Sequence, residues 1–287
     1  MGKWLFPWRN TPWSLKQDLL AGLVVSILII PQAIGYGLLA HLPAASALAC
    51  CIFPVLAYAI FGNGRAIAIG PVAIVSLMVG DALTQIPAAE QVAAAQLLAL
   101  QVAGTLLVMR FLRLGNLVHF IGHPVIHGFT AAAALLIIVK QLPLLFGVTL
   151  FSDQVPHLTT TILGLLAIFV LVLMARLRQP TISKLGPLFV ITLGIFATLL
   201  WPDAQLARIP IEQGTPVIQF NGQLPWHYFL TLLPSASLIA LIGFLESSSV
   251  IKSLNHKQPS EKQSAFNPNQ ELAGLGAANI AASMFQG

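Results

Sequence analysis

The sequence predicts an all-α protein that crosses a membrane many times. Of its 287 residues, 57% are hydrophobic and only 8% are charged, whereas a soluble domain carries roughly a quarter charged residues. A spanning helix needs about 20 apolar residues, and apolar stretches of this length recur along the whole chain. The basic residues are also distributed unevenly between the connecting segments, as in a polytopic membrane protein.

We expect a cytoplasmic N-terminal segment at 1–14, followed by one transmembrane domain at 15–287. The nine predicted segments of that domain are 15–40, 44–61, 70–86, 91–109, 119–141, 158–175, 186–201, 226–251 and 270–286. With the N-terminus in the cytoplasm, all of the 14 Lys and Arg residues except Lys140 and Arg208 fall on the cytoplasmic side. This asymmetry is the positive-inside pattern. The net charge of +5 therefore reflects topology, and we expect no nucleic-acid partner.

The first segment contains a polar patch around Pro31, Gln32 and Tyr36 within an otherwise apolar run. Proline removes a backbone hydrogen bond, and lipid cannot satisfy the freed carbonyl or a side-chain amide. We therefore expect the helix to be interrupted at Pro31 and the patch to face a watery cavity. Transporters place their substrates at such breaks.

The third segment has a different kind of interruption. Residues 66–69 favour a short strand, Gly70 and Pro71 break it, and a helix follows from Val72. A helix that begins at mid-membrane depth presents unpaired N–H groups and a positive dipole end to an anion. An ordinary helix with proline near its start explains the pattern equally well at this stage.

Glu246 is followed by three serines and is the one acidic residue that we place inside a predicted segment. An ionisable group within a membrane marks an ion pathway by default, because its burial in lipid is costly. The alternative is that the segment ends earlier and Glu246 lies at the interface.

The histidines at 119, 123 and 127 recur every four residues and would share one face of a continuous helix, as metal ligands do. Pro124 predicts a new helix start between them, so we favour interfacial histidines and expect no metal site. The chain has no Gly-rich nucleotide-binding loop and no nucleophile–base arrangement. We therefore expect neither an enzyme nor a cofactor.

Four motifs, in order, resemble those of the SulP anion transporters. They are Pro31–Ala40 with Leu42-Pro43, the stretch Phe61–Gly80, the tetrapeptide Phe244–Ser247, and Asn267–Leu272 with Gly276 and Asn279. The resemblance covers residues 15–287. It implies a fold of fourteen segments in two inverted repeats of seven, of which this chain holds the first repeat and the start of the second. The chain is thus expected to be C-terminally truncated and to lack the family's STAS domain.

The resemblance implies secondary active transport of a small inorganic or organic anion, with sulfate foremost, across the inner cell membrane. Gln32 and Tyr36 would contact the anion, and Val72 and Ala73 would offer it backbone N–H groups. Glu246 would couple transport to a proton or, as the less favoured choice, to Na⁺. Partners would be the lipid bilayer and a second copy in a homodimer. An exchanger or channel for chloride or bicarbonate, a nucleobase transporter of the same fold and an inactive fragment remain alternatives.

Overall fold

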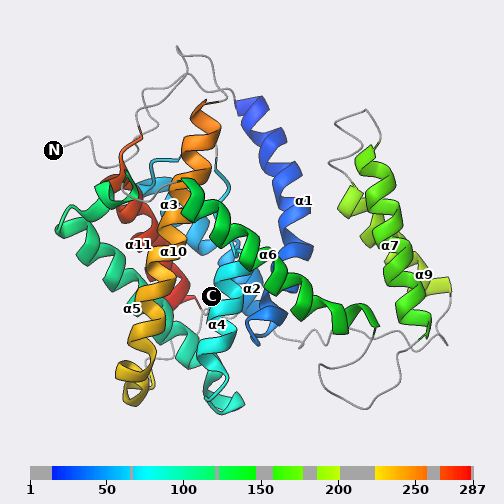
Figure 1. Cartoon of the computed structure of the whole chain (residues 1–287), viewed down its shortest axis with the longest axis horizontal. Helices are drawn as coiled ribbons and strands as arrows, with labels where there is room; N and C mark the ends of the chain where they lie inside the picture. The colour runs from blue at the N-terminus through cyan, green and yellow to red at the C-terminus, as the bar shows by residue number, and fades with distance from the viewer. Residues whose placement is uncertain are drawn as a thin grey trace. The chain divides into compact units, whose positions relative to one another are not determined.

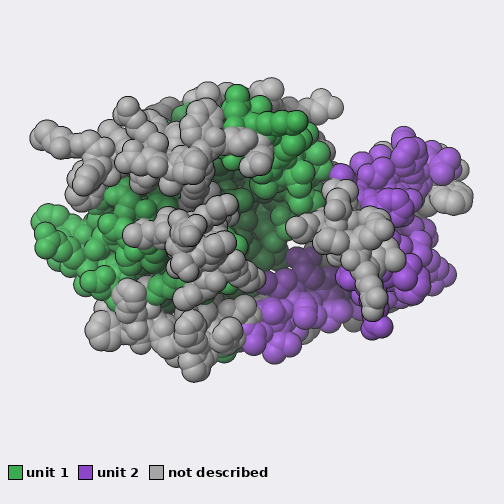
Figure 2. All heavy atoms as spheres, turned by 90° about the horizontal axis from the view of Figure 1, so that it is seen from above, with its two compact units in different colours: residues 1–128, 211–287 green, residues 129–210 purple. Residues whose placement is uncertain are grey.

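All regular elements in the described part of the chain are helices (Figure 1). The computed structural model describes residues 15–64, 67–119, 123–146, 158–176, 186–200, 224–256 and 266–285. The chain divides into two compact units, one of residues 1–128 with 211–287 and one of residues 129–210 (Figure 2).

The first unit contains the long helices and both segments that the sequence marked as polar interruptions. Its elements are α1 (Leu15–Leu39), α2 (Ala44–Cys50), α3 (Phe53–Phe61), α4 (Ala73–Leu83), η1 (Ala88–Glu90), α5 (Gln91–Phe111), η2 (Leu114–His119), η4 (Trp226–Tyr228), α10 (Phe229–His256) and α11 (Pro268–Met284). Helix α6 (His123–Phe146) begins in this unit and continues into the second.

The second unit contains α7 (Leu158–Arg176) and α9 (Gly186–Leu200), which lie against each other. Gly164 on α7 faces Leu145 near the end of α6, since a side chain at this glycine would meet that leucine. Helix α7 has no buried residue, and its exposed side chains include Leu165, Phe169 and Leu173. An apolar helix with its side chains exposed is suited to contact with lipid.

Five helical stretches among the described residues are long and apolar enough to cross a membrane. They are Asp18–Leu39, Ala44–Phe61, Ala88–Phe111, Leu158–Arg176 and Trp226–Leu254. Two shorter apolar helices, α4 and α9, match predicted segments as well. The predicted multi-pass, all-helical architecture is confirmed.

The predicted interruption of the first segment at Pro31 is wrong. Helix α1 continues through Pro31 to Leu39 without a break. Proline in a helix interior removes one hydrogen bond and strains one turn, and the flanking turns of this long helix supply enough hydrogen bonds to continue it. The chain reverses only after Leu39, where His41 adopts a positive φ of 56° and the Leu42 N–H bonds to the Gly37 carbonyl at 2.9 Å.

The predicted bounds of the second segment, 44–61, agree with the structure, although a turn divides it, and the predicted end of the fifth segment is corrected. The second segment consists of two helices, α2 and α3, because the chain turns at Cys51 and Ile52 and Pro54 then occupies the first turn of α3. The fifth segment does not end before Pro143, since α6 runs through it to Phe146.

The strand predicted at 66–69 is not observed at Ile67–Ile69, which form an irregular segment. A strand needs a partner for its backbone N–H and C=O groups, and no strand occurs elsewhere among the residues that the structure describes. Ala66 itself lies outside those residues. The helix that follows, α4, has 11 residues and a length of roughly 16 Å. This length is about half of the ~30 Å hydrocarbon core, so the helix is as short as predicted and too short to cross the core alone.

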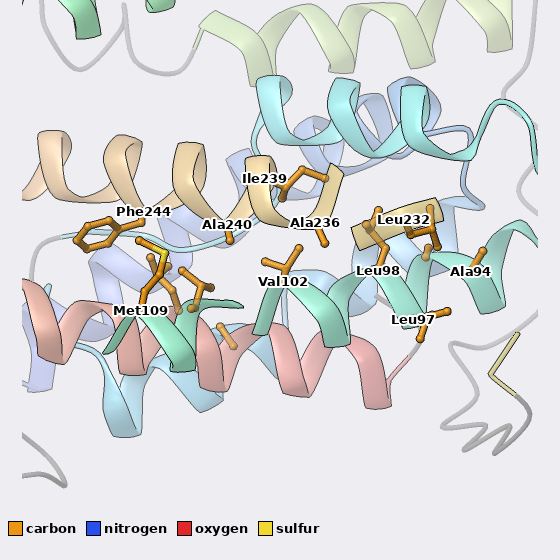
Figure 3. Close-up of a cluster of buried hydrophobic side chains, with 14 of the residues drawn as sticks. Ala94, Leu97, Leu98, Val102, Met109, Leu232, Ala236, Ile239, Ala240 and Phe244 are labelled. Carbon is orange, nitrogen blue, oxygen red and sulfur yellow. The ribbon is translucent and has the colours of Figure 1, made fainter. Parts of the chain in front are cut away.

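Helix α5 forms the centre of the first unit, because it packs against both α10 and α11. In Figure 3, Leu98 and Val102 of α5 face Ala236 and Ala240 of α10, whereas Leu97 is directed away from α10. Ala236 and Ala240 on α10 are almost fully buried there, and such small residues permit close helix packing. Glu246 on α10 and the irregular segment that precedes α4 line the same cavity.

Candidate functional site

A cavity of about 340 Å³ lies within the first unit. Its walls come from α1 to α5, α10, α11 and the irregular segment 67–72. The lining is mostly apolar, and its polar members are Tyr36, Ser46, Ser76, Glu246, Ser247 and Asn279. A mostly apolar cavity with a few converging polar groups is the usual form of a small-molecule site.

The N-terminus of α4 forms part of the cavity wall. Pro71, Val72, Val75 and Ser76 all line the cavity. Val72 caps α4 in an extended conformation, with φ −124° and ψ 141°, and no side chain caps the helix. The first intrahelical bond runs from the Ser76 N–H to the Val72 carbonyl at 2.9 Å. The N–H groups of the first turn therefore have no intrahelical acceptor and remain available to a ligand.

Close contact between α4 and the end of α1 fixes the position of this helix. A side chain at Gly80 would collide with the Leu39 carbonyl and would lie 3.2 Å from the Ala40 Cα. Glycine thus allows the two backbones to approach. The approach brings Tyr36 and Gly37, on the last turn of α1, to the same cavity as the start of α4.

Three of the five predicted site residues, Tyr36, Val72 and Glu246, line this cavity. Ala73 is half-buried at the first position of α4 and is not among the lining residues. Gln32 is exposed on α1 and does not line the cavity either. The structure brings together residues from the first, third and eighth predicted segments.

Glu246 lies well inside α10, ten residues before its end at His256. One carboxylate oxygen, Oε2, is buried and has no hydrogen-bond partner among the described residues. The helical segment therefore does not end before Glu246, because α10 continues for almost three turns beyond it. An unpartnered carboxylate oxygen beside a cavity is costly unless it binds a proton, a cation or water.

None of the described residues that line the cavity is Lys, Arg or His. An anion in this cavity would therefore meet hydroxyl, amide and backbone N–H donors. Glu246 is the one carboxylate in the lining, and its ionised form would repel an anion over a short distance of low dielectric. Protonation or ionisation of Glu246 would consequently change the electrostatic potential in the cavity more than any other lining side chain could.

A further carboxylate, Glu271, is fully buried, with 0% of its surface exposed, and was not among the predicted site residues. Glu246 is therefore not the single acidic residue within a helical segment, since Glu271 lies in the first turns of α11 and Asp81 lies in α4. The dipeptide Asn267-Pro268 is a helix-start signal that could have placed Glu271 inside a helix. The Asn267 side chain accepts hydrogen bonds from the backbone N–H groups of Asn269 and Gln270, so the helix begins before Glu271.

Glu271 accepts hydrogen bonds from two side chains next to the cavity, those of Tyr58 and Ser247. Tyr58 donates to its two oxygens at 2.9 and 2.8 Å, and the Ser247 hydroxyl donates to Oε1 at 2.5 Å. Ser247 lines the cavity, whereas Tyr58 and Glu271 do not.

The histidines at 119, 123 and 127 have side chains outside the described residues, although a helix boundary separates the first two as predicted. Among the described residues no group of three His, Cys, Asp or Glu side chains could hold a metal ion.

Comparison with known proteins supplies the context for this cavity. The model of the sulfate permease family matches residues 15–287. The chloroplastic sulfate transporter 4.1 of Arabidopsis thaliana is 36% identical over 98% of this chain, and the chain covers 44% of that relative. This chain thus spans about half the length of the curated relatives it matches.

Two solved structures have a similar fold. The murine solute carrier 26 family member A9, an anion transporter in an inward-facing state, matches with a TM-score of 0.81 and 22% identity, over 98% of this chain and 52% of that chain. The transmembrane domain of a cyanobacterial bicarbonate transporter matches with a TM-score of 0.77 and 20% identity, over 95% of this chain and 73% of that one. At these identities the likeness concerns the fold alone.

Proposed function

This chain belongs to the sulfate permease family, and on that premise we propose that it forms the substrate-binding part of a secondary active anion transporter, with sulfate as the leading substrate. The observation that carries the proposal is the cavity into which the first turn of α4 opens. Unpaired N–H groups and a helix dipole make this end a suitable seat for an oxyanion.

The anion would occupy the space between Tyr36, Val72 and Ser76. The phenol of Tyr36 and the hydroxyl of Ser76 can donate hydrogen bonds, and Val72 and Ala73 would contribute backbone N–H groups. Gln32 is exposed in the described conformation. Its contact with the anion would require a conformation in which this face of α1 turns toward the cavity.

Glu246 would couple anion movement to a proton. In its ionised form the carboxylate repels an anion in the same cavity, and protonation removes that repulsion. Binding of a proton and of an anion would then assist each other, as the reciprocity of linked binding requires. Na⁺ is the less favoured coupling ion, because a proton needs only the one carboxylate of the lining, whereas Na⁺ would need further oxygen ligands arranged around it.

The deciding experiment measures uptake of ³⁵S-sulfate into proteoliposomes by this chain, with and without an inward proton gradient. Saturable uptake that the gradient accelerates supports proton-coupled transport. Uptake stimulated by internal anion but not by the gradient would indicate an exchanger, and currents far above carrier turnover would indicate a channel. If this chain binds and takes up no anion, the alternative of an inactive fragment is supported.

Membrane placement and assembly also belong to the proposal. We expect the N-terminus in the cytoplasm, the inner cell membrane as the location, and a homodimer as the assembly. Cysteine accessibility at the N-terminal segment and the mass of the purified protein in detergent test the orientation and the assembly.

A further inference from the structure

The buried carboxylate of Glu271 joins three separate parts of the first unit. It accepts hydrogen bonds from Tyr58 on α3 and from Ser247 on α10, and it lies itself on α11. Tyr58 is 5% exposed, Ser247 is 6% exposed and Glu271 is 0% exposed. Water does not compete for these bonds, so each contributes more than an exposed hydrogen bond does.

The direction of the Tyr58 hydroxyl hydrogen follows from the other hydrogen bond that this hydroxyl makes. The backbone N–H of Gly64 donates to the Tyr58 hydroxyl at 3.0 Å. A phenol has a single hydrogen, so that of Tyr58 is directed to Glu271. The carboxylate thereby holds Tyr58 in an orientation that also fixes the backbone at Gly64.

Gly64 connects this group to one wall of the cavity. A side chain at Gly64 would lie 2.5 Å from the Ile67 Cγ2 and 2.7 Å from the Tyr58 hydroxyl. The turn at 62–64 is therefore pressed between Tyr58 and Ile67, and Ile67 is the first described residue of the segment that lines the cavity up to Val72. Displacement of Tyr58 would change the path of the chain into the start of α4.

Ser247 connects the same carboxylate to the opposite wall. It follows Glu246 on α10, and both residues line the cavity. Its hydroxyl donates to Glu271 at 2.5 Å. Glu271 does not line the cavity itself. It is linked to two parts of the cavity wall, to one through its hydrogen bond with Ser247 and to the other through Tyr58 and Gly64.

We propose that Glu271 is a positioning residue of the anion site, which holds the α10 wall with Glu246 and the wall formed by residues 67–72 in their binding arrangement. It acts through Ser247 and Tyr58 and does not touch the anion. This inference rests on the proposed function, because it assigns Glu271 a role in the affinity of the same cavity.

The substitution Glu271→Gln isolates the role of the carboxylate. Glutamine has almost the same shape but replaces one acceptor oxygen with an NH₂ donor. Ser247 and Tyr58 would then share the one remaining acceptor oxygen, and neither hydrogen bond would be made to a charged acceptor. We expect the Kd for sulfate to rise about tenfold or more, as for loss of a buried hydrogen bond to a charged group.

The test measures equilibrium binding of ³⁵S-sulfate to the purified chain in detergent, together with its melting temperature. The variants are Glu271→Gln, Ser247→Ala, Tyr58→Phe and the double variant Glu271→Gln/Ser247→Ala. Gln101→Leu is the matched control, because Gln101 also ties α10 to a neighbouring helix, through Nε2 and the Phe229 carbonyl at 2.7 Å, but it does not line the cavity.

We expect each of the three single variants to weaken sulfate binding, and the double variant to be little weaker than Glu271→Gln alone, since the two residues act through one bond. Gln101→Leu should lower the melting temperature without changing the Kd. A lowered melting temperature with wild-type affinity in Glu271→Gln would overturn the proposal, and so would fully additive effects in the double variant.

If Glu271→Gln does not fold, Tyr58→Phe decides the question, because Tyr58 lies away from the cavity and an unchanged Kd in that variant contradicts the inference. A different result would refute the proposed function itself: a wild-type chain that binds no sulfate, chloride or bicarbonate. Wild-type binding with unaffected variants refutes only the role of Glu271.

Discussion

The hydroxyl of Tyr58 lies within hydrogen-bonding distance of both carboxylate oxygens of Glu271, at 2.9 and 2.8 Å, although 213 residues separate the two in sequence. This contact joins α3 to α11 at a point that neither water nor lipid reaches. Helices α3 and α11 pack closely, and Gln270 on α11 also donates to the Phe61 carbonyl on α3, so these two polar contacts together set the register of the interface.

Tyr58→Phe should lower the stability of the protein. The change leaves Glu271 with one donor fewer and leaves the Gly64 N–H without its acceptor. Loss of a buried hydrogen bond to a charged group costs about 1.5–3 kcal/mol. Thermal unfolding of the purified protein in detergent measures the effect. Tyr228→Phe, at the surface turn η4, is the control and should show a smaller loss; an equal loss in both would contradict the role given to the Glu271 contact.

Gly274→Ala should destabilise the packing of α11 on α3. A side chain at Gly274 would overlap the Gly62 backbone and would lie 3.0 Å from the Tyr58 ring. Inserting a methyl group into a well-packed contact costs about 1–3 kcal/mol. Gly104→Ala on α5 is the matched control, because nothing lies within 4 Å of a side chain there, and it should stabilise the helix by up to about 1 kcal/mol.

The two glycine variants are compared by their melting temperatures under identical conditions. Opposite shifts are expected. A Gly274→Ala protein as stable as the wild type would show that α11 does not approach α3 as closely as described.

Glu246→Gln should abolish the acceleration of anion uptake by a proton gradient. Glutamine keeps the size of the side chain but cannot change its charge, so a proton would no longer alter the field in the cavity. Uptake of ³⁵S-sulfate into proteoliposomes, measured across a series of external pH values, provides the readout. Glu90→Gln is the control, since Glu90 lies outside the cavity lining and its side chain is 46% exposed.

We expect the Glu90→Gln protein to keep the wild-type pH profile. A Glu246→Gln protein with an unchanged profile would refute proton coupling through this residue, whichever anion is transported.

Val72→Phe should weaken anion binding by filling the space at the first turn of α4. Val72 lines the cavity at the helix start, and a larger side chain there would obstruct access to the unpaired N–H groups. The Kd for ³⁵S-sulfate should rise by about tenfold or more if a hydrogen-bonded oxyanion is displaced. Leu77→Phe on the same helix does not touch the cavity lining and serves as the control. Unchanged affinity in Val72→Phe would place the anion elsewhere.

Several boundaries could be predicted because they follow from local chemistry. The break at Gly70-Pro71 predicted the start of α4, and the apolar run after it was visibly too short for a full span. Pro31 and Pro143 misled the prediction for the opposite reason. Proline disfavours a helix locally, but a long helix with many neighbouring hydrogen bonds tolerates it, and the sequence around each proline does not reveal which outcome prevails.

The candidate site was only partly predictable for a similar reason. Tyr36, Val72 and Glu246 stood out as polar or helix-breaking features in apolar surroundings, and all three line one cavity. Glu271 was overlooked because it follows a polar loop and resembles a residue of that loop. Its burial depends on contacts with α3 and α10, which no local pattern records.

The sequence by itself determined that this chain is helical, lies in a membrane and carries an ionisable group within an apolar helix, since composition and hydrophobic length are local properties of the chain. Only the tertiary structure decided which polar residues meet. The cavity and the Tyr58–Glu271–Ser247 contacts arise from helices distant in sequence. Their meeting depends on glycine-mediated approach and on the packing of α5, α10 and α11, which are properties of the assembled fold.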